Sequence, residues 1–399
     1  MKILMIANYV SFPWEAGNCR FMYLADLLCK NNEVELVTSK FCHTKKQKRE
    51  YSTEYNELNF KVTLLDEPGY RKNVSIKRIY SHKILARKLR KYLNSLENKP
   101  DVIYCSVPSL DLAFEAIKYA NKNNIRFVID IQDLWPEAFK MVINIPIISN
   151  LIFYPMMKKA NYIYSHSDEI VAVSKTYVNR ALAVNKKVDN GLSVFLGTDL
   201  TYFDKCYNEN KKEFNDNIIR VAYIGTLGTS YNIKSIIDAI KLLKNKGINN
   251  IKFVVMGDGP LKLDFEKYAE EAGIDCNFTG RLDYPEMVGL LCACDIAVNP
   301  IVGTSIASII NKVGDYAAAG IAVVNTQNSK EYINLLKKYK AGLSCNSNDS
   351  NDIAEKIEYL INNKRERNQL GNGNRKMAEE LFDRSRTYSC ITKLITKRN

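Results

Sequence analysis

The sequence predicts an α/β protein with two Rossmann-like, doubly wound domains that face a cleft. Short runs of mostly apolar, branched residues alternate with helical patterns, which is the order of parallel strands with helices on both faces of a sheet. This series occurs twice, and a polar, charged stretch, DKCYNENKKEFNDN, separates the two series. At 399 residues the chain is also too long for one ordinary hydrophobic core.

Each domain is expected to hold six strands. Those of the first are KILMIA, VELVTS, FKVTLL, DVIYCS, RFVIDI and EIVAVS. Those of the second are IRVAYIG, IKFVVMG, CNFTG, DIAVNP, IAVVNT and AGLSC. We expect an N-terminal domain over residues 1–205 and a C-terminal domain over 215–382. A last helix over 383–399 follows the FDRS break and is expected to cross back to the first domain.

The stretch ASIINKVGDYAAAGIAVVN, residues 307–325, predicts a buried helix that stops at Gly320 and then a strand buried on both faces. Its two charged side chains, Lys312 and Asp315, lie about one helical turn apart. They suit either a satisfied helix-terminus pair or a ligand site.

Net charge is +13 and is concentrated in residues 41–100, which hold 15 lysines and arginines against six acids. Such a patch attracts anions, namely nucleic acid, acidic lipid headgroups or a phosphorylated substrate. No nucleic-acid-binding motif is present, so we expect no nucleic acid partner. Part of the patch, KRIYSHKILARKLRKYLNSL, predicts a helix whose inward residues are Ile79, Ile84, Leu85, Leu89 and Leu93. An ordinary solvated helix face is the alternative.

The ten cysteines show no disulfide or metal spacing, which is typical of a reduced, cytoplasmic protein. The N-terminus lacks the layout of a signal peptide. The most apolar segment, MVINIPIISNLIFYPMM at 141–157, is short for a membrane span and carries two prolines. With the following KKANYIYSH it suits either the headgroup zone of a membrane or a core-packed helix pair.

Candidate ligand sites lie where strands end. Gly17, Asn18 and Arg20 precede the first helix, and a glycine there lets backbone N–H groups approach a phosphate. Gly225 and Gly228 occupy a second strand-to-helix junction. Two further side chains follow strands, Asp133 at a Trp-Pro turn and Arg281.

The order of these pieces resembles the family 4 retaining glycosyltransferases of the GT-B fold, over nearly the whole chain. The resemblance rests on GNCRF, DLWPE, EIVAVSKTY, FLGTD, YIGTLG, FVVMGDGPL, FTGRLDYPEM, CDIAVNP and NKVGDYAAAG. DLWPE and GN-R are typical of members that build bacterial capsule, O-antigen or exopolysaccharide units on lipid carriers. The resemblance implies a C-terminal domain that binds the nucleotide sugar and an N-terminal domain that faces the acceptor and the membrane.

The resemblance also implies roles for single residues. Asp315 stands where the family has the second glutamate of E-x7-E, which hydrogen-bonds the donor's ribose. The first glutamate is replaced by Ala307, and we expect Thr304 and Ser305, in the GTS of residues 303–305, to substitute. Thr226 and Tyr231 replace an arginine and a lysine of the family. The remaining groups for the donor diphosphate are Lys234, Lys312 and the N–H groups near Gly17 and Gly228.

The implied reaction is metal-independent transfer of a hexosyl or N-acetylhexosaminyl group with retention, without a cofactor. The acceptor is expected to be a polyprenyl-diphosphate-linked saccharide, and the enzyme peripheral on an anionic membrane surface, on the inner face of the plasma membrane. Lys312 and Asp133 are the candidate catalytic residues; for Asp133 the alternative is a cap of its turn. The only D-x-D-like run, DIQD, has the wrong spacing for a metal site. Two other functions stay open, a nucleotide-sugar 2-epimerase and a non-catalytic nucleotide-sugar-binding protein.

Overall fold

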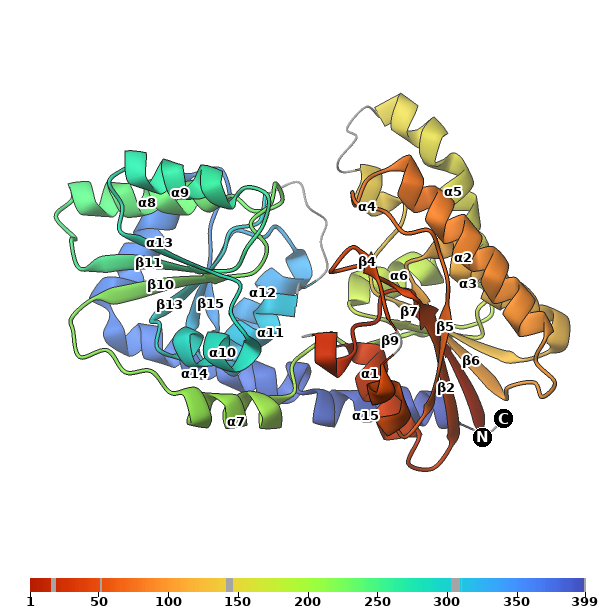
Figure 1. The fold of residues 1–399 in the computed structure, drawn as a ribbon. Coiled ribbons are helices and arrows are strands. Elements are labelled where there is room, and N and C mark those ends of the chain that lie inside the picture. The colour runs from red at the N-terminus through yellow and green to blue at the C-terminus, as the bar shows by residue number, and fades with distance from the viewer. Residues whose placement is uncertain (16–18, 51, 141–145, 303–308, 310, 398–399) are drawn as a thin grey trace. The chain divides into compact units, whose positions relative to one another are not determined.

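The chain forms two compact units in a computed structural model that describes residues 1–399 except 16–18, 51, 141–145, 303–308, 310 and 398–399 (Figure 1). Unit 1 comprises Met1–Val194 and Tyr388–Asn399, and unit 2 comprises Phe195–Thr387. The last helix, α15 (Arg384–Thr396), therefore begins in unit 2 and continues in unit 1.

The boundary lies before the polar stretch that we expected to be a linker. The first part of that stretch belongs to helix α7 (Leu200–Asn210). Asp199 caps this helix by accepting a hydrogen bond from the Tyr202 N–H, and Leu200 and Phe203 are buried. The charged composition of residues 204–210 thus covers one face of a packed helix.

Unit 1 is built on a seven-stranded parallel sheet in the order β5-β2-β1-β6-β7-β8-β9. All six predicted strands are present, as β1 (Lys2–Ile6), β2 (Glu33–Ser39), β5 (Lys61–Leu65), β6 (Val102–Val107), β7 (Arg126–Ile131) and β8 (Glu169–Ala172). The short edge strand β9 (Leu192–Ser193) was not predicted. The basic loop after β2 contains an antiparallel hairpin, β3 (Phe41–Cys42) with β4 (Gln47–Lys48).

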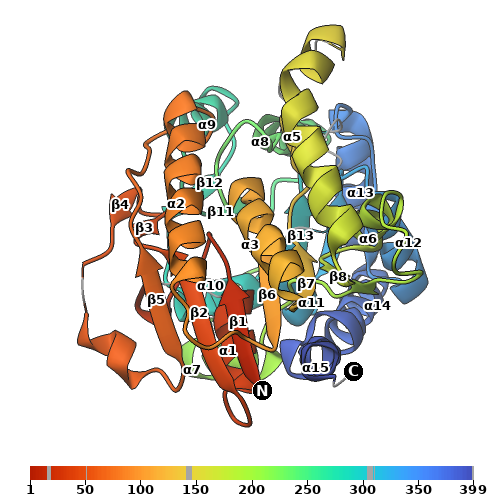
Figure 2. The same ribbon diagram turned by 90° about the vertical axis from the view of Figure 1, so that its right-hand side faces the viewer.

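Helices connect these strands. They are α1 (Arg20–Leu28), α2 (Ile76–Asn94), α3 (Leu110–Asn123), α4 (Glu137–Lys140), α5 (Pro146–His166) and α6 (Lys175–Leu182), with short helices at Pro13–Glu15 and Thr53–Glu57. Helix α3 packs against both α2 and α5, so the N-terminal halves of α2 and α5 stand on either side of its first turn (Figure 2). Along α2 the inward residues Leu85, Leu89 and Leu93 are buried as predicted, but Ile79 is 49% exposed.

Unit 2 is built on a six-stranded parallel sheet in the order β12-β11-β10-β13-β14-β15, the order typical of a Rossmann fold. The six predicted strands are present, as β10 (Ile219–Ile224), β11 (Ile251–Met256), β12 (Cys276–Gly280), β13 (Ile296–Asn299), β14 (Ala322–Asn325) and β15 (Gly342–Ser344). The helices are α7, α8 (Ile233–Asn245), α9 (Lys262–Glu271), α10 (Tyr284–Cys292), α11 (Asn311–Ala318), α12 (Lys330–Tyr339), α13 (Ser350–Asn362) and α14 (Lys364–Met377), and a π-helical turn at Ala378–Phe382.

The predicted end of α11 is confirmed. The helix stops at Ala318, and Gly320 follows with φ +63, a left-handed conformation that favours glycine. Strand β14 after it is buried along its whole length. In each sheet the strand order reverses beside the first strand, at β1/β6 and at β10/β13. Ligands of such sheets bind beyond the carboxyl ends of the strands at these points.

Candidate donor site in the second unit

The loops after β10 and β13 meet at the switch point of unit 2. Tyr231 and Ile301 form an isolated β-bridge, and the Asn232 N–H donates to the Pro300 carbonyl at 2.8 Å. The loop after β11 closes on the same place, because a Cβ on Gly257 would lie 1.9 Å from the Gly225 carbonyl oxygen. Three strand-end loops therefore pack backbone against backbone here, and only glycine permits the approach.

No described residue packs closely against Gly228 in the first of these loops. A Cβ built on Gly228 would meet Thr226 Cγ2 at 3.9 Å, which is ordinary van der Waals distance. No close packing in the described structure therefore requires glycine at this position. A backbone position without a side chain lets an anionic group approach the loop's N–H groups.

Lys312 places an ammonium group at this junction. The side chain is buried, with the residue 8% exposed, and Nζ has no hydrogen-bond partner among the described residues. Nζ lies 3.9 Å from the centre of the Tyr223 ring and 3.8 Å from that of Tyr231. A Cβ on Gly225 would lie 3.1 Å from Nζ, so the amine stands at the end of β10.

Burial holds the pKa of Lys312 well below its ordinary value. Two aromatic faces compensate only part of the lost hydration of an ammonium group. A buried polar atom without a partner is costly and calls for an explanation. An anion bound beside this loop is an explanation that the geometry supports.

Asp315 lies one turn further along α11 and has different neighbours. Its Oδ1 accepts hydrogen bonds from Thr198 Oγ1 and from Tyr284 Oη, each at 2.9 Å. No described residue donates to Oδ2. Burial raises the pKa of Asp315, and the two hydrogen bonds oppose that shift. The carboxylate is thus fixed by one oxygen, which leaves the other for a hydroxyl donor.

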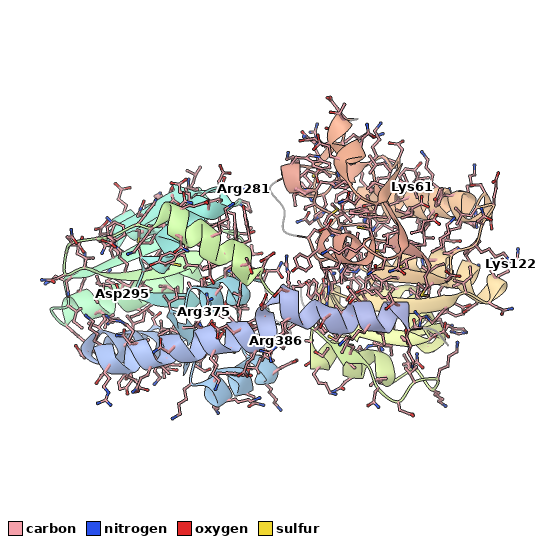
Figure 3. All side chains as sticks on the ribbon, turned by 90° about the horizontal axis from the view of Figure 1, so that it is seen from below. Lys61, Lys122, Arg281, Asp295, Arg375 and Arg386 are labelled. Atoms are coloured by element: carbon pink, nitrogen blue, oxygen red, sulfur yellow. The ribbon has the colours of Figure 1, made fainter. Side chains whose placement is uncertain are left out.

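The other predicted donor residues of unit 2 lie apart from Lys312 or outside the described residues. Lys234 is exposed near the start of α8, with Nζ 4.6 Å from the Tyr268 ring centre on α9. Arg281 is exposed just after β12 (Figure 3). Thr304 and Ser305, together with Gly303 and Ala307, lie outside the described residues. The structure therefore brings together Gly225, Gly228 and Lys312, and fixes Asp315 nearby on the same helix.

In unit 1, Gly17 and Asn18 lie outside the described residues. Arg20 is fully buried, and its guanidinium reaches Asp130 Oδ1 at 3.3 Å and the Val194 carbonyl at 2.9 Å. Its guanidinium carbon also lies 5.0 Å from the ring centre of Tyr388. These contacts occupy Arg20 inside the core of unit 1, so the structure favours a structural role over the predicted donor contact.

Asp133 follows β7 as predicted. Its Oδ1 accepts from the Leu134 N–H at 2.9 Å, and its Oδ2 accepts from Trp135 Nε1 at 3.1 Å. Burial raises the pKa of Asp133, and the bond from Trp135 opposes the shift. These contacts are those of the turn cap that was the alternative interpretation.

Sequence reasoning missed the roles of four side chains that shape the candidate donor site. Tyr223 and Tyr231 enclose the Lys312 amine, and Thr198 and Tyr284 orient Asp315. Tyr231 was noted only as the replacement for a cation. Thr198 is 117 residues from its partner, a separation at which no local pattern signals contact.

Comparisons with known proteins agree with this architecture. Residues 205–377, within unit 2, match the family described as glycosyl transferases group 1. The structure of HepE from Anabaena in complex with UDP has a TM-score of 0.71 and 14% identity, covering 99% of this chain and 100% of that one. At this identity the likeness shows the fold, and the predicted class, two Rossmann-like halves of the GT-B type, is confirmed.

Two curated relatives are similar over part of their length. The enzyme named "GalNAc-alpha-(1->4)-GalNAc-alpha-(1->3)-diNAcBac-PP-undecaprenol alpha-1,4-N-acetyl-D-galactosaminyltransferase" from Campylobacter jejuni is 26% identical over 54% of this chain and 62% of its own. The capsular polysaccharide biosynthesis glycosyltransferase CapM from Staphylococcus aureus is 25% identical over 58% of this chain and 61% of its own. The chain thus spans less than two thirds of either relative.

Two features of the described residues concern membranes and metal ions. None of their helices combines the length and the apolar character needed to cross a membrane. Within the same residues no three His, Cys, Asp or Glu side chains lie together in a way that would hold a metal ion.

Proposed function

We propose that the protein is a retaining glycosyltransferase. It transfers a hexosyl or N-acetylhexosaminyl group from a nucleotide sugar to a lipid-linked saccharide during synthesis of a bacterial surface polysaccharide. The single observation that carries the proposal is the buried amine of Lys312, which has no hydrogen-bond partner among the described residues and lies at the switch point of a Rossmann sheet. The match of unit 2 to the group 1 glycosyl transferases and the UDP complex of HepE support a nucleotide-sugar donor.

The donor diphosphate would take the position that Lys312 and the loop at Gly225 and Gly228 leave for an anion. A nucleotide sugar departs as a nucleoside diphosphate, and the negative charge that develops on its oxygens needs fixed positive groups. The Lys312 amine, once protonated, supplies a full charge in a buried setting where it acts strongly. We assign Oδ2 of Asp315 to the ribose hydroxyls, since Thr198 and Tyr284 occupy Oδ1.

The proposed reaction retains the configuration at the sugar. The bond between the anomeric carbon and the diphosphate oxygen breaks as an oxocarbenium-like transition state forms. The acceptor hydroxyl attacks the same face, and its proton passes to the departing diphosphate. The products are the glycosylated acceptor and the nucleoside diphosphate. This route requires no pair of catalytic carboxylates and no metal, and addition of EDTA is expected to leave the rate unchanged.

The lipid-linked acceptor is proposed from the charge of unit 1 and from the relatives. One curated relative is named for an undecaprenol-linked substrate, and another for capsule biosynthesis. Helix α2 exposes Lys83, Arg87, Lys88 and Arg90, which would hold the enzyme at an anionic membrane surface. The enzyme would then act as a peripheral protein on the inner face of the plasma membrane.

The test is a reaction of the purified chain with a panel of nucleotide sugars, beginning with UDP-sugars, and a short-chain polyprenyl-diphosphate sugar. Nucleotide release together with a product heavier by one sugar supports the transferase. An epimerised donor without transfer would identify a 2-epimerase instead. Saturable binding of the nucleotide sugar without any turnover would identify a non-catalytic protein, a possibility motivated by Ala307, Thr226 and Tyr231.

Two variants separate the role of Asp315 in ligand binding from its role in packing. Asp315→Ala removes both oxygens and is expected to weaken UDP binding by at least about tenfold, the loss of a charge-assisted hydrogen bond. Thr198→Val removes one donor to Oδ1 and leaves Oδ2 intact, so UDP affinity should stay within about twofold. Equal losses in the two variants would show that Asp315 acts through the packing of α11. Isothermal titration calorimetry gives both affinities.

A further inference from the structure

Unit 1 carries an apolar groove of about 600 Å³ lined by residues from the N-terminal halves of α2 and α5 and from the first turn of α3. Its walls include Ile76 and Ile79 of α2, Ile152, Phe153 and Met156 of α5, and Trp135. A volume of this size is typical of a small-molecule site. The groove explains why Ile79, predicted to face the core, is exposed.

The apolar walls continue into exposed apolar side chains at the rim. Ile76 is 86% exposed and Ile152 is 57% exposed, and both line the groove. Exposed aliphatic residues that gather around a hollow mark a binding surface more often than scattered ones do. The occupant is therefore apolar over part of its length.

A second hollow, of about 670 Å³, lies on the other side of the start of α2 and is cationic. The charged side chains that line it are Lys46, Lys48, Arg71, Lys72 and Lys77, and no carboxylate is among the lining residues. We call it the cationic hollow. Ser75 lines both the groove and the cationic hollow, and its hydroxyl caps α2 by accepting from the Arg78 N–H at 3.2 Å. The positive end of the helix dipole adds to the field at this point.

The inner wall of the groove is held by aromatic and cationic contacts. The Arg78 guanidinium carbon lies 4.7 Å from the Trp135 ring centre, and an Arg78 nitrogen donates to Tyr9 Oη at 2.6 Å. Trp135 in turn donates to Asp133. The groove thus ends at the turn after β7, at the carboxyl ends of the strands, where ligands of such folds bind.

We propose that the groove and the cationic hollow together bind the polyprenyl diphosphate of the acceptor, with one isoprenoid chain in the groove and the diphosphate at the cationic hollow. The inference rests on the proposed lipid-linked acceptor and names its site. The groove complements an apolar chain, and the adjoining cationic hollow complements an anion attached to that chain. Lys48 is paired with Asp66 at 2.7 Å, which leaves Lys46, Arg71, Lys72 and Lys77. Four cationic side chains still exceed what the single charge of a phosphodiester needs, and therefore favour a diphosphate over a phospholipid headgroup.

The test uses farnesyl diphosphate below its micelle concentration, with no bilayer present. Trp135 lines the groove, and the chain's other tryptophan, Trp14, is replaced in a Trp14→Phe background. Farnesyl diphosphate is expected to change Trp135 fluorescence saturably, and calorimetry gives the affinity. Farnesol and inorganic pyrophosphate, each carrying half of the ligand's chemistry, should bind at least about tenfold more weakly.

A matched pair of variants on one helix locates the chain. Ile152→Glu puts a charge on the groove wall and should weaken farnesyl diphosphate binding by at least about tenfold. Leu151→Glu adds the same charge to the neighbouring residue, which is 78% exposed and does not line the groove, so affinity should stay within about twofold. Lys77→Glu should weaken farnesyl diphosphate and pyrophosphate but not farnesol.

Three results would overturn the proposal. The first is that farnesyl diphosphate does not bind, and the second is that Ile152→Glu and Leu151→Glu have the same affinity for it. The third is that monomeric dihexanoyl phosphatidylglycerol binds as tightly as farnesyl diphosphate, which would make the surface a phospholipid site. UDP binding and sugar transfer are measured on the same samples. A chain that still glycosylates a lipid-linked acceptor but does not bind farnesyl diphosphate would refute this site and leave the proposed transferase standing.

Discussion

At the scale of single residues, Lys312 combines a cost in stability with a proposed gain in binding. Its amine is buried without a described partner, and burial lowers its pKa from the ordinary value of 10.5. We expect Lys312→Met, of similar length and apolar, to raise the free energy of unfolding by about 1–3 kcal/mol at neutral pH, since it removes an unsatisfied polar group. The same variant should bind UDP at least about tenfold more weakly.

The pH dependence gives a second measurement of the same prediction. The unfolded chain binds the lysine proton more tightly than the folded chain, so protonation favours unfolding as the pH falls below 10.5. The stability of the parent should therefore fall relative to Lys312→Met as the pH is lowered from 10.5, until the folded pKa is reached. Urea denaturation at several pH values measures the gap. A gap that is constant with pH would mean that the amine keeps its proton equally in both states.

Arg20 illustrates a different case, a buried charge that is paired with the carboxylate of Asp130. Removing one partner of a buried ion pair leaves the other charge uncompensated, so Arg20→Met should lower the free energy of unfolding by about 3–5 kcal/mol. Adding Asp130→Asn neutralises the stranded carboxylate and keeps an acceptor for Tyr104, whose hydroxyl bonds Asp130 at 2.8 Å. The double variant should recover part of the loss. It should also bind UDP like the parent, whereas a stable Arg20→Met protein that cannot bind UDP would restore the predicted donor role.

At the scale of elements, we expect the proposed donor site to depend on how closely the loops after β10 and β11 approach each other. Gly257 has φ +156, and a Cβ there would meet the Gly225 carbonyl, so Gly257→Ala must push the two loops apart. Gly273→Ala is the control, because Gly273 has φ +69 but nothing lies within 4 Å of its Cβ position. The free energy of unfolding of the control should fall by only about 1–2 kcal/mol, the cost of a left-handed backbone conformation for alanine.

Gly257→Ala should lower the free energy of unfolding by about 1–3 kcal/mol more than the control does, which is the usual cost of overpacking. Gly257→Ala should also weaken UDP binding, because it displaces Gly225, which adjoins the Lys312 amine. Gly273→Ala should leave UDP binding unchanged. Thermal unfolding and calorimetry on the two proteins make the comparison. If both variants bind UDP like the parent, the spacing of these loops does not control the donor site.

The elements themselves follow from local patterns, and this explains which predictions were confirmed. The twelve predicted strands are apolar runs long enough to be buried in parallel sheets, and all are present. Strand β9 has only two residues, too few for a pattern. The predicted linker included residues 204–210, the second part of helix α7, because the exposed face of this helix is charged. The contacts of Arg20 with Val194, and of Asp315 with Thr198, join distant segments, so their roles come from tertiary packing that no local pattern encodes.

At the scale of the whole molecule, the excess of positive charge predicts association with anionic membranes. Lys83, Arg87, Lys88 and Arg90 are exposed along α2, whose N-terminal half borders the apolar groove. Each basic residue near an anionic surface contributes about 1 kcal/mol to binding. A quadruple variant with glutamine at these positions should therefore pellet far less with phosphatidylglycerol vesicles than the parent, and the difference should shrink as salt screens the charges.

A matched control separates the effect of the lost net charge from the effect of where the lost charges lie. Lys241, Lys244, Lys246 and Lys337 lie on helices of unit 2 or just beyond them, and their replacement by glutamine removes the same net charge from another part of the chain. That protein should pellet nearly like the parent. Equal losses in the two quadruple variants would mean that net charge alone drives association, and parent-like pelleting of the α2 variant would make its basic residues an ordinary solvated face. Binding of UDP, measured on both proteins, should be unchanged because neither set touches the switch point of unit 2.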